Sequence, residues 1–137
     1  MPKAPQIEKI HGPAGREIVK GIRAYNAAAV GKFDYRPLTV TVRVRGKIVG
    51  GLVGETFFGW MFVRLLWVSE RHRGKGWGSS LMQTAEAEAR NRGVGNVYLD
   101  SFSFQAPKFY AKLGYREFGR LKEFPAGYDR VWLTKAL

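Results

Sequence analysis

The chain has 137 residues, of which 45% are hydrophobic and 14% are aromatic. This length and composition predict one compact domain spanning residues 1–137, because a second hydrophobic core has no room. Cysteine is absent, which excludes disulfides, thiolate metal ligands and a cysteine nucleophile. The two histidines, His11 and His72, lie too far apart for metal-ligand spacing. We therefore expect no metal site.

The charge is strongly positive, since 23 Lys and Arg face 11 Asp and Glu and give a net charge of +12. Such a field attracts anionic partners such as nucleotides or nucleic acids. The basic residues are scattered along the chain, so a nucleic-acid partner stays open but is not favoured. The densest apolar run, residues 60–68, is too short to span a bilayer, and the first residues lack the apolar core of a secretory signal. We expect a cytoplasmic protein without membrane association.

The first half of the chain predicts a helix followed by a β-hairpin. Apolar residues recur at helical spacing over residues 16–30, which indicates an amphipathic helix. Over residues 38–55 the period changes to two, with alternate valines on one face. Gly46 and Lys47 are expected to form the turn of this hairpin, after which the second strand returns.

The second half alternates strands and helices. Residues 60–68 predict a third, well-buried strand, which a glycine-rich loop follows. A helix is expected to begin at Trp77 and to end near Gly93, a residue suited to the left-handed cap position. The remaining elements are expected in this order: a strand over 96–100, a short helix over 106–114, and two closing strands over 115–121 and 128–137.

This order of elements defines the expected fold class. The strand, helix and strand from Trp60 to Asp100 imply a parallel pair of strands. The hairpin before them and the two closing strands are expected to pair in antiparallel fashion. The sequence therefore predicts a mixed α/β (α+β) fold: a mostly antiparallel sheet with one central parallel pair, flanked by helices.

The stretch WVSERHRGKGWGSSLM, from Trp67 to Met82, joins the third strand to the following helix. In it, three cations alternate with three glycines: Arg71, Arg73 and Lys75, and Gly74, Gly76 and Gly78. A helix N-terminus exposes unpaired backbone N–H groups and carries a partial positive charge, and glycines let the backbone approach a phosphate closely. The hydroxyl of Ser79 lies in the first helical turn. This loop predicts a site for a pyrophosphate.

Two known phosphate-binding loops fit this stretch poorly. A P-loop requires Gly-Lys-Ser or Gly-Lys-Thr, whereas here Gly74-Lys75 is followed by Gly76. The dinucleotide-binding pattern would use Asp100 as the ribose-binding acid but requires a glycine where Ser79 stands. The 37 residues after Asp100 are also too few to complete a doubly wound sheet.

A third pattern is Arg or Gln, two residues, Gly, one residue, then Gly or Ala, and residues 71–76 meet it as RHRGKG. A second motif, APKFYAKLGY, follows at residues 106–115. In these motifs and in its order of elements the chain resembles the GNAT superfamily of acetyl-CoA-dependent N-acetyltransferases. The resemblance implies the acyl-CoA N-acyltransferase fold, in which the central parallel strands splay apart and the pantetheine arm of acetyl-CoA lies between them.

The resemblance also implies roles for individual residues. Tyr110 would protonate the departing thiolate, since a tyrosine with a pKa near 10 is protonated at neutral pH, and the amide of Val68 would donate to the thioester carbonyl. The general base is open among Glu55, Glu70, Asp100 and a water chain, with Glu55 preferred because it ends the strand that leads towards the cleft. The implied contacts to acetyl-CoA are Leu66, Trp67, Val68, Arg71, Arg73, Gly74, Lys75, Gly76, Trp77, Gly78, Ser79, Ser103 and Phe109.

The predicted reaction is direct attack of a primary amine, on an unidentified small-molecule or protein acceptor, on the thioester of acetyl-CoA. One alternative is acetylation of aminoacyl-tRNA, which a positive surface would suit. Another is a non-catalytic module that binds acetyl-CoA or nucleic acid, which stays open because no base is obvious and Ser103 stands where the family often has asparagine. Members of the family commonly dimerise, so a homodimer is a further expectation.

Overall fold

The computed structural model describes residues 4–9 and 12–137, which fall into two compact units. The first unit ends at Phe33 and contains helix α1 (Ala14–Val30), which confirms the predicted N-terminal helix and begins two residues earlier. Within it, the guanidinium of Arg23 lies 5.1 Å from the centre of the Phe33 ring. The prediction of a single domain covers both units and stays a prediction.

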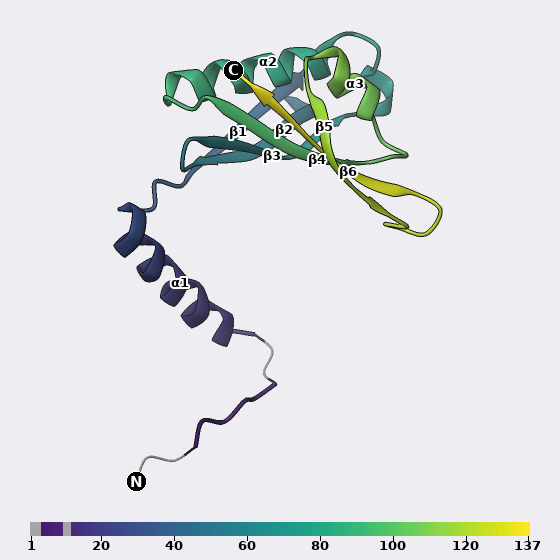
Figure 1. Cartoon of the computed structure of the whole chain (residues 1–137). Helices are drawn as coiled ribbons and strands as arrows, with labels where there is room; N and C mark the ends of the chain where they lie inside the picture. The colour runs from purple at the N-terminus through teal and green to yellow at the C-terminus, as the bar shows by residue number, and fades with distance from the viewer. Residues whose placement is uncertain (1–3, 10–11) are drawn as a thin grey trace. The chain divides into compact units, whose positions relative to one another are not determined.

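The second unit, Asp34–Leu137, is built on a six-stranded sheet with the strand order β1-β2-β3-β4-β6-β5. Of the strand pairs, β3 and β4 run parallel and the others antiparallel, which confirms the predicted fold class. Figure 1 shows α2 and α3 on the same side of this sheet. The elements are β1 (Arg36–Val44), β2 (Lys47–Phe57), β3 (Trp60–Val68), the 3₁₀ turn η1 (Glu70–His72), α2 (Trp77–Asn91), β4 (Asn96–Phe102), α3 (Pro107–Lys112), β5 (Arg116–Lys122) and β6 (Asp129–Ala136).

The turn of the first hairpin lies one residue earlier than predicted. Arg45 and Gly46 form it, with φ angles of 51° and 79°, and Lys47 already pairs with Val44 in the sheet. A two-residue hairpin loop favours positive φ at both central positions because that geometry matches the twist of the strands. Glycine satisfies this requirement at the second position, so the expected Gly46-Lys47 turn is wrong by one residue.

Residues 60–68 were expected to form a well-buried strand, but within the second unit β3 is buried on one face. Met61 and Val63 are buried, whereas Leu65 is 61% and Trp67 52% exposed. The strand alternates because successive side chains of a strand point to opposite faces, and within the second unit α2 and α3 cover one face of the sheet (Figure 1). Within the second unit, its apolar run therefore belongs to a strand with one covered face.

The core of the second unit lies between α2 and the covered face of the sheet. The predicted apolar face of α2 is buried there: Leu81, Met82, Ala85 and Ala89. The helix ends as expected at Gly93, whose φ of +75° is left-handed. The amide of Val94 then donates to the carbonyl of Ala89 over 2.9 Å, which is the long bond of a Schellman cap.

A β-bulge in β3 determines where the sheet opens. Val53 pairs with Leu65 but Gly54 pairs with Val63, so Arg64 is an extra residue in β3. The parallel pairing of β3 with β4 ends at the same level, with Val63 opposite Leu99. Beyond this point the two strands separate, in agreement with the splayed arrangement that the family resemblance implies.

Gly54 makes the bulge possible, and its substitution is expected to destabilise the fold. A Cβ added at Gly54 would overlap the carbonyl oxygen of Phe62, whereas one added at Gly95 meets nothing within 4 Å. Gly54→Ala should lower the free energy of unfolding by about 1–3 kcal/mol, the usual cost of overpacking, and Gly95→Ala should change it by less than about 0.5 kcal/mol. Urea unfolding measures both. Equal midpoints for the two variants would contradict this role of Gly54.

Candidate active site

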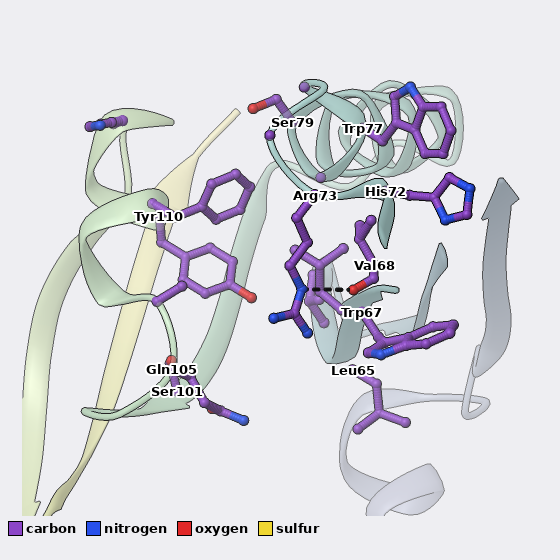
Figure 2. Close-up of a pocket in the computed structure, with 18 of the residues that line it drawn as sticks. Leu65, Trp67, Val68, His72, Arg73, Trp77, Ser79, Ser101, Gln105 and Tyr110 are labelled. Carbon is purple, nitrogen blue, oxygen red and sulfur yellow. Dashed lines mark hydrogen bonds between the residues drawn. The ribbon is translucent and has the colours of Figure 1, made fainter. Parts of the chain in front are cut away.

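A cleft of about 880 Å³ lies where β3 and β4 separate. Its lining combines the end of β3, the glycine loop, the first turn of α2, the end of β4 and the helix α3, as Figure 2 shows. The lining residues are 63–68, 72–74, 76–79, 100–101, 104–106, 109, 110 and 112. All of them belong to the second unit.

Most of the residues predicted to bind the cofactor or to act on it come together in this cleft. The structure places these in its lining: Leu66, Trp67, Val68, Arg73, Gly74, Gly76, Trp77, Gly78, Ser79, Phe109 and Tyr110. Four others lie outside the lining: Glu55, Arg71, Lys75 and Ser103. The roles of both groups remain predictions, and the geometry shows what each could do.

The glycine loop turns the chain so that α2 begins at the cleft. Gly74 and Gly76 have φ angles of +75° and +78°, in the left-handed region that favours glycine. Ser80 donates the first helical hydrogen bond, to the carbonyl of Gly76 over 3.1 Å. The amides of residues 77–79 come before it and have no carbonyl within the helix. This end of the cleft can therefore accept an anion, aided by the helix dipole.

Cations approach the cleft from two sides. Arg73, in the loop, donates from Nε to the carbonyl oxygen of Val68 over 3.1 Å, and Figure 2 shows this bond inside the cleft. Lys112 lines the cleft from α3. Lys75 instead places its ammonium 5.4 Å from the centre of the Trp77 ring. Together with Arg64 of β3, Arg73 and Lys112 make three positive side chains in the lining of the cleft, and their charge favours a phosphate group.

Aromatic packing fixes the loop and α3 around the cleft. The ring of His72 stacks on Trp77 with centroids 5.3 Å apart, and its Nδ1 lies 2.6 Å from the hydroxyl of Ser69. On the other side, a Cβ added at Gly78 would lie 3.3 Å from the ring of Phe109. A glycine at this position therefore lets α3 approach α2 closely.

Tyr110 points its hydroxyl into the cleft (Figure 2) and is only 9% exposed. Its ring contacts Phe109 and Tyr115 edge to face. Burial, and to a smaller extent the negative charge of Asp100, raises the pKa of Tyr110 to about 12. The hydroxyl therefore keeps its proton at neutral pH and can donate it within the cleft.

The three carboxylates considered as bases occupy different positions. Asp100 lines the cleft. Its Oδ1 accepts a hydrogen bond from Arg130 Nε over 2.9 Å and lies 2.8 Å from Arg130 Nη2 in an ion pair. Glu55 is 5% exposed, lies outside the lining and forms an ion pair with Arg64. Glu70, in η1, is exposed. Of the three, Asp100 is the one that could touch a molecule in the cleft.

The sequence and structure comparisons agree on the family. The model of the acetyltransferase (GNAT) family matches residues 10–115. The chain belongs to the GNAT acetyltransferase family. Its fold and both of its sequence motifs are therefore those of an acyltransferase, as the resemblance implied.

Known proteins that are similar to this chain are named as acetyltransferases. This chain is 39% identical over 127 residues to acetyltransferase Atu2258 of Agrobacterium fabrum, and the match covers 89% of this chain and 93% of the relative. It is 42% identical over 109 residues to blasticidin-S acetyltransferase of Streptomyces morookaense, covering 76% and 80%. The crystal structure of a Bacillus cereus acetyltransferase is similar with a TM-score of 0.91 and 35% identity, covering 97% of this chain and 98% of that one.

Several lining residues of this GNAT enzyme escaped sequence reasoning. Lys112 lies one helical turn after Phe109, so its spacing within the second motif could have revealed it. Phe104 and Gln105 lie in a loop without periodicity, and no sequence signal places them in the cleft. The side-chain oxygen of Gln105 accepts from the amide of Phe102 over 2.8 Å, which shapes this loop.

Ser103, predicted to contact the cofactor, has protein partners. Its amide donates to the carbonyl of Asp129 over 2.8 Å, and its hydroxyl accepts from the amide of Asp129 over 2.9 Å. These bonds tie the end of β4 to β6. Within the residues that the structure describes, no helix is long and apolar enough to cross a membrane, and no group of three or more potential ligands could hold a metal.

Proposed function

We propose that this acetyltransferase transfers the acetyl group of acetyl-CoA to a primary amine. One observation carries the proposal: a single cleft has the N-terminal amides of α2 at one end and the protonated hydroxyl of Tyr110 inside it. The first can hold a pyrophosphate and the second can protonate a thiolate. A thioester substrate with a phosphorylated tail requires both.

The bulge supports the placement of the pantetheine arm. The parallel pairing of β3 ends at Val63, so the backbone of residues 64–68 faces the cleft without β4 as its partner. Amide groups of a pantetheine arm can pair with such a strand edge as a further strand would. Arg73 and the amides of residues 77–79 would hold the phosphates at the adjoining end.

The chemical step would be direct attack by the amine on the thioester carbonyl carbon, after the bound ammonium has lost one proton to solvent and become neutral. The carbon–nitrogen bond forms, and the amide of Val68 stabilises the negative carbonyl oxygen. The carbon–sulfur bond then breaks, and the thiolate takes the proton of Tyr110. The surplus proton on the new amide nitrogen leaves to solvent, from which Tyr110 is reprotonated. Glu55, the base preferred from the sequence, could act only through water because it lies outside the lining.

The test is acceptor-dependent release of CoA. Purified protein and acetyl-CoA would be combined with primary amines, amino acids, peptides and aminoacyl-tRNA, and the free thiol would be measured. Blasticidin S belongs in this panel because a relative that is 42% identical is named for its acetylation. Release with an amine, together with the acetylated product, is the expected result. Tight CoA binding without release by any acceptor would contradict the proposal.

Acetylation of aminoacyl-tRNA is a second candidate, supported by the net charge of +12. An acceptor held through several phosphates loses affinity steeply as salt rises, whereas a small amine does not. The dependence of KM on salt therefore separates the two acceptor classes.

The raised pKa of Tyr110 gives a pH prediction. A hydroxyl with a pKa of about 12 keeps its proton throughout the range from neutral to pH 10. The ratio of kcat between the native enzyme and Tyr110→Phe should therefore stay constant from about pH 7 to pH 10. Rate profiles of both proteins measure it. A ratio that fell towards one by about pH 9 would show that Tyr110 loses its proton well below a pH of about 12, which would contradict the raised pKa.

A further inference from the structure

Four aromatic side chains gather at the end of β4 and on the hairpin that joins β5 to β6. We call Phe102, Phe104, Phe124 and Tyr128 the aromatic wall. The rings of Phe102 and Phe104 are stacked, with centroids 5.4 Å apart and an interplanar angle of 1°. Tyr128 meets Phe104 edge to face at 5.0 Å, and Phe124 lies 5.8 Å from Phe102. The wall is thus one contiguous cluster.

The aromatic wall is exposed and adjoins the cleft. Phe104 is 53%, Tyr128 48% and Phe124 39% exposed. Phe104 also lines the cleft, as do its neighbour in sequence Gln105 and Tyr110. Contiguous exposed apolar surface beside a cleft is typical of a ligand-binding surface. The wall therefore extends the cleft beyond the part that the glycine loop and α2 enclose.

Asp100 connects the cleft to the aromatic wall. Asp100 lines the cleft with 17% of its side chain exposed, and the hydrogen bond from Arg130 Nε and the ion pair with Nη2 are both made to Oδ1. The guanidinium of Arg130 in turn lies 5.5 Å from the centre of the Phe102 ring and 5.0 Å from that of Phe124. Arg130 thus orients the carboxylate, and Oδ2 stays available to a donor in the cleft.

The charges around Asp100 restrict what can bind there. The nearby carboxylate Glu55 is already paired with Arg64, which itself lines the cleft. Asp100 forms an ion pair with Arg130. The net charge of the chain is +12. A single ammonium can be accommodated by one free carboxylate oxygen, whereas a further positive group would lie near the guanidinium groups of Arg64 and Arg130.

We infer that Asp100 binds the ammonium of the acceptor and that the aromatic wall holds a planar ring attached to it. The acceptor class is then a monocationic primary amine that carries an aromatic or conjugated ring. The ring would stack on, or meet edge-on, the exposed face of Phe104, because aromatic pairs favour these geometries. This inference rests on the proposed acetyl transfer and adds to it the recognition of the acceptor.

The test compares amines matched in charge and size. The probes are 2-phenylethylamine, its saturated counterpart 2-cyclohexylethylamine, and the polycation spermidine. Two quantities are measured for each: kcat/KM by CoA release, and the Kd for the CoA-loaded protein. The native enzyme should favour the phenyl over the cyclohexyl amine about tenfold, within the range of aromatic pairing. Spermidine should be the poorest acceptor.

Phe104→Leu should reduce the preference for the phenyl amine to about one while leaving the cyclohexyl amine within about threefold of its native value. The matched control is Phe118→Leu, because Phe118 is equally exposed at 56% but lies in β5, outside the wall and the lining. It should keep the native preference. Equal kcat/KM values for the two amines in the native enzyme would contradict the role of the aromatic wall. So would an equal loss of the preference in Phe104→Leu and Phe118→Leu.

Asp100→Asn should lower kcat/KM for both monoamines about a hundredfold, because a charge-assisted hydrogen bond to the ammonium is lost. The Kd for CoA should stay within about threefold of the native value. If Asp100 had only a structural role, its loss would change this Kd as well. Glu117→Gln is the control, since Glu117 is also paired with an arginine, Arg120, but lies on β5 away from the cleft. Amine binding that is unaffected by Asp100→Asn would overturn the inference.

The two measurements separate this inference from the proposed function. If the cyclohexyl amine is acetylated as fast as the phenyl amine, acetyl transfer is supported, but the proposed role of the aromatic wall is contradicted. If no amine is acetylated, the proposed function is contradicted. The inference is then tested by the Kd of each amine for the CoA-loaded protein. Preferential binding of the phenyl amine that both Asp100→Asn and Phe104→Leu abolish would still support an aromatic amine site, and absence of that preference would overturn it.

Discussion

Gly76→Asp is expected to weaken CoA binding at least about a hundredfold while leaving the chain folded. The new carboxylate would stand at the N-terminus of α2, where the pyrophosphate is proposed to lie. Two like charges about 4 Å apart near a protein surface repel each other by about 4 kcal/mol. This exceeds the energy of about 2.7 kcal/mol that corresponds to a hundredfold loss of affinity. Calorimetric titration with CoA measures the loss.

The local structure at Gly76 indicates that the variant will fold. Its φ is +78°, but a Cβ added there meets nothing within 4 Å. Aspartate and asparagine visit this left-handed region more readily than other residues with side chains. Gly76→Asn is therefore the matched control, since it has the same shape without the charge, and it should lose less than about tenfold in affinity. Equal affinities of the Asp and Asn variants for CoA would refute the electrostatic argument.

Tyr110→Phe is expected to lower kcat about a hundredfold and to leave the Kd for CoA unchanged. Loss of a general acid costs roughly 10² to 10⁴ in rate, and the phenylalanine ring keeps the contacts with Phe109 and Tyr115. Steady-state rates at saturating acceptor, with a parallel CoA titration, measure both quantities. An unchanged kcat would remove Tyr110 from the mechanism.

Tyr115→Phe supplies the control for this experiment. The hydroxyl of Tyr115 donates to Glu86 over 2.8 Å in the core, and Lys135 binds the other oxygen of that carboxylate over 2.8 Å. Removing this hydroxyl should lower the free energy of unfolding by about 1–3 kcal/mol, because a buried acceptor loses a donor. It should not lower kcat, since Tyr115 does not line the cleft. A similar loss of kcat in both variants would indicate a packing effect.

The local patterns of the sequence identified much of the site. Alternating valines and helical spacing predicted the elements of the sheet and α2, and glycines with φ angles near +75° marked the loop and the end of α2. Residues 71–76 and 106–115 carried the resemblance to the family. The predictions of the elements and of the family succeeded because backbone preference and side-chain period act over a few neighbouring residues. The phosphate-binding role of the loop stays a prediction.

Other features depended on contacts between distant residues. The one-sided burial of β3 follows from the placement of α2 and α3 on a single face of the sheet, which no property of residues 60–68 reveals. Which carboxylate reaches the cleft depends on the bulge at Arg64 and on the separation of β3 from β4, and Asp100 rather than Glu55 lines it.

The sequence by itself determined the order of the elements, the glycine loop and the family of this acetyltransferase, because each depends on local pattern. The tertiary structure alone decided the surroundings of Asp100 and the aromatic wall. Phe102 and Phe104 meet Phe124 and Tyr128 only because β4 pairs with β6, and the same pairing brings Arg130 to Asp100. Strand pairing across about thirty residues sets these contacts, and no local period encodes them.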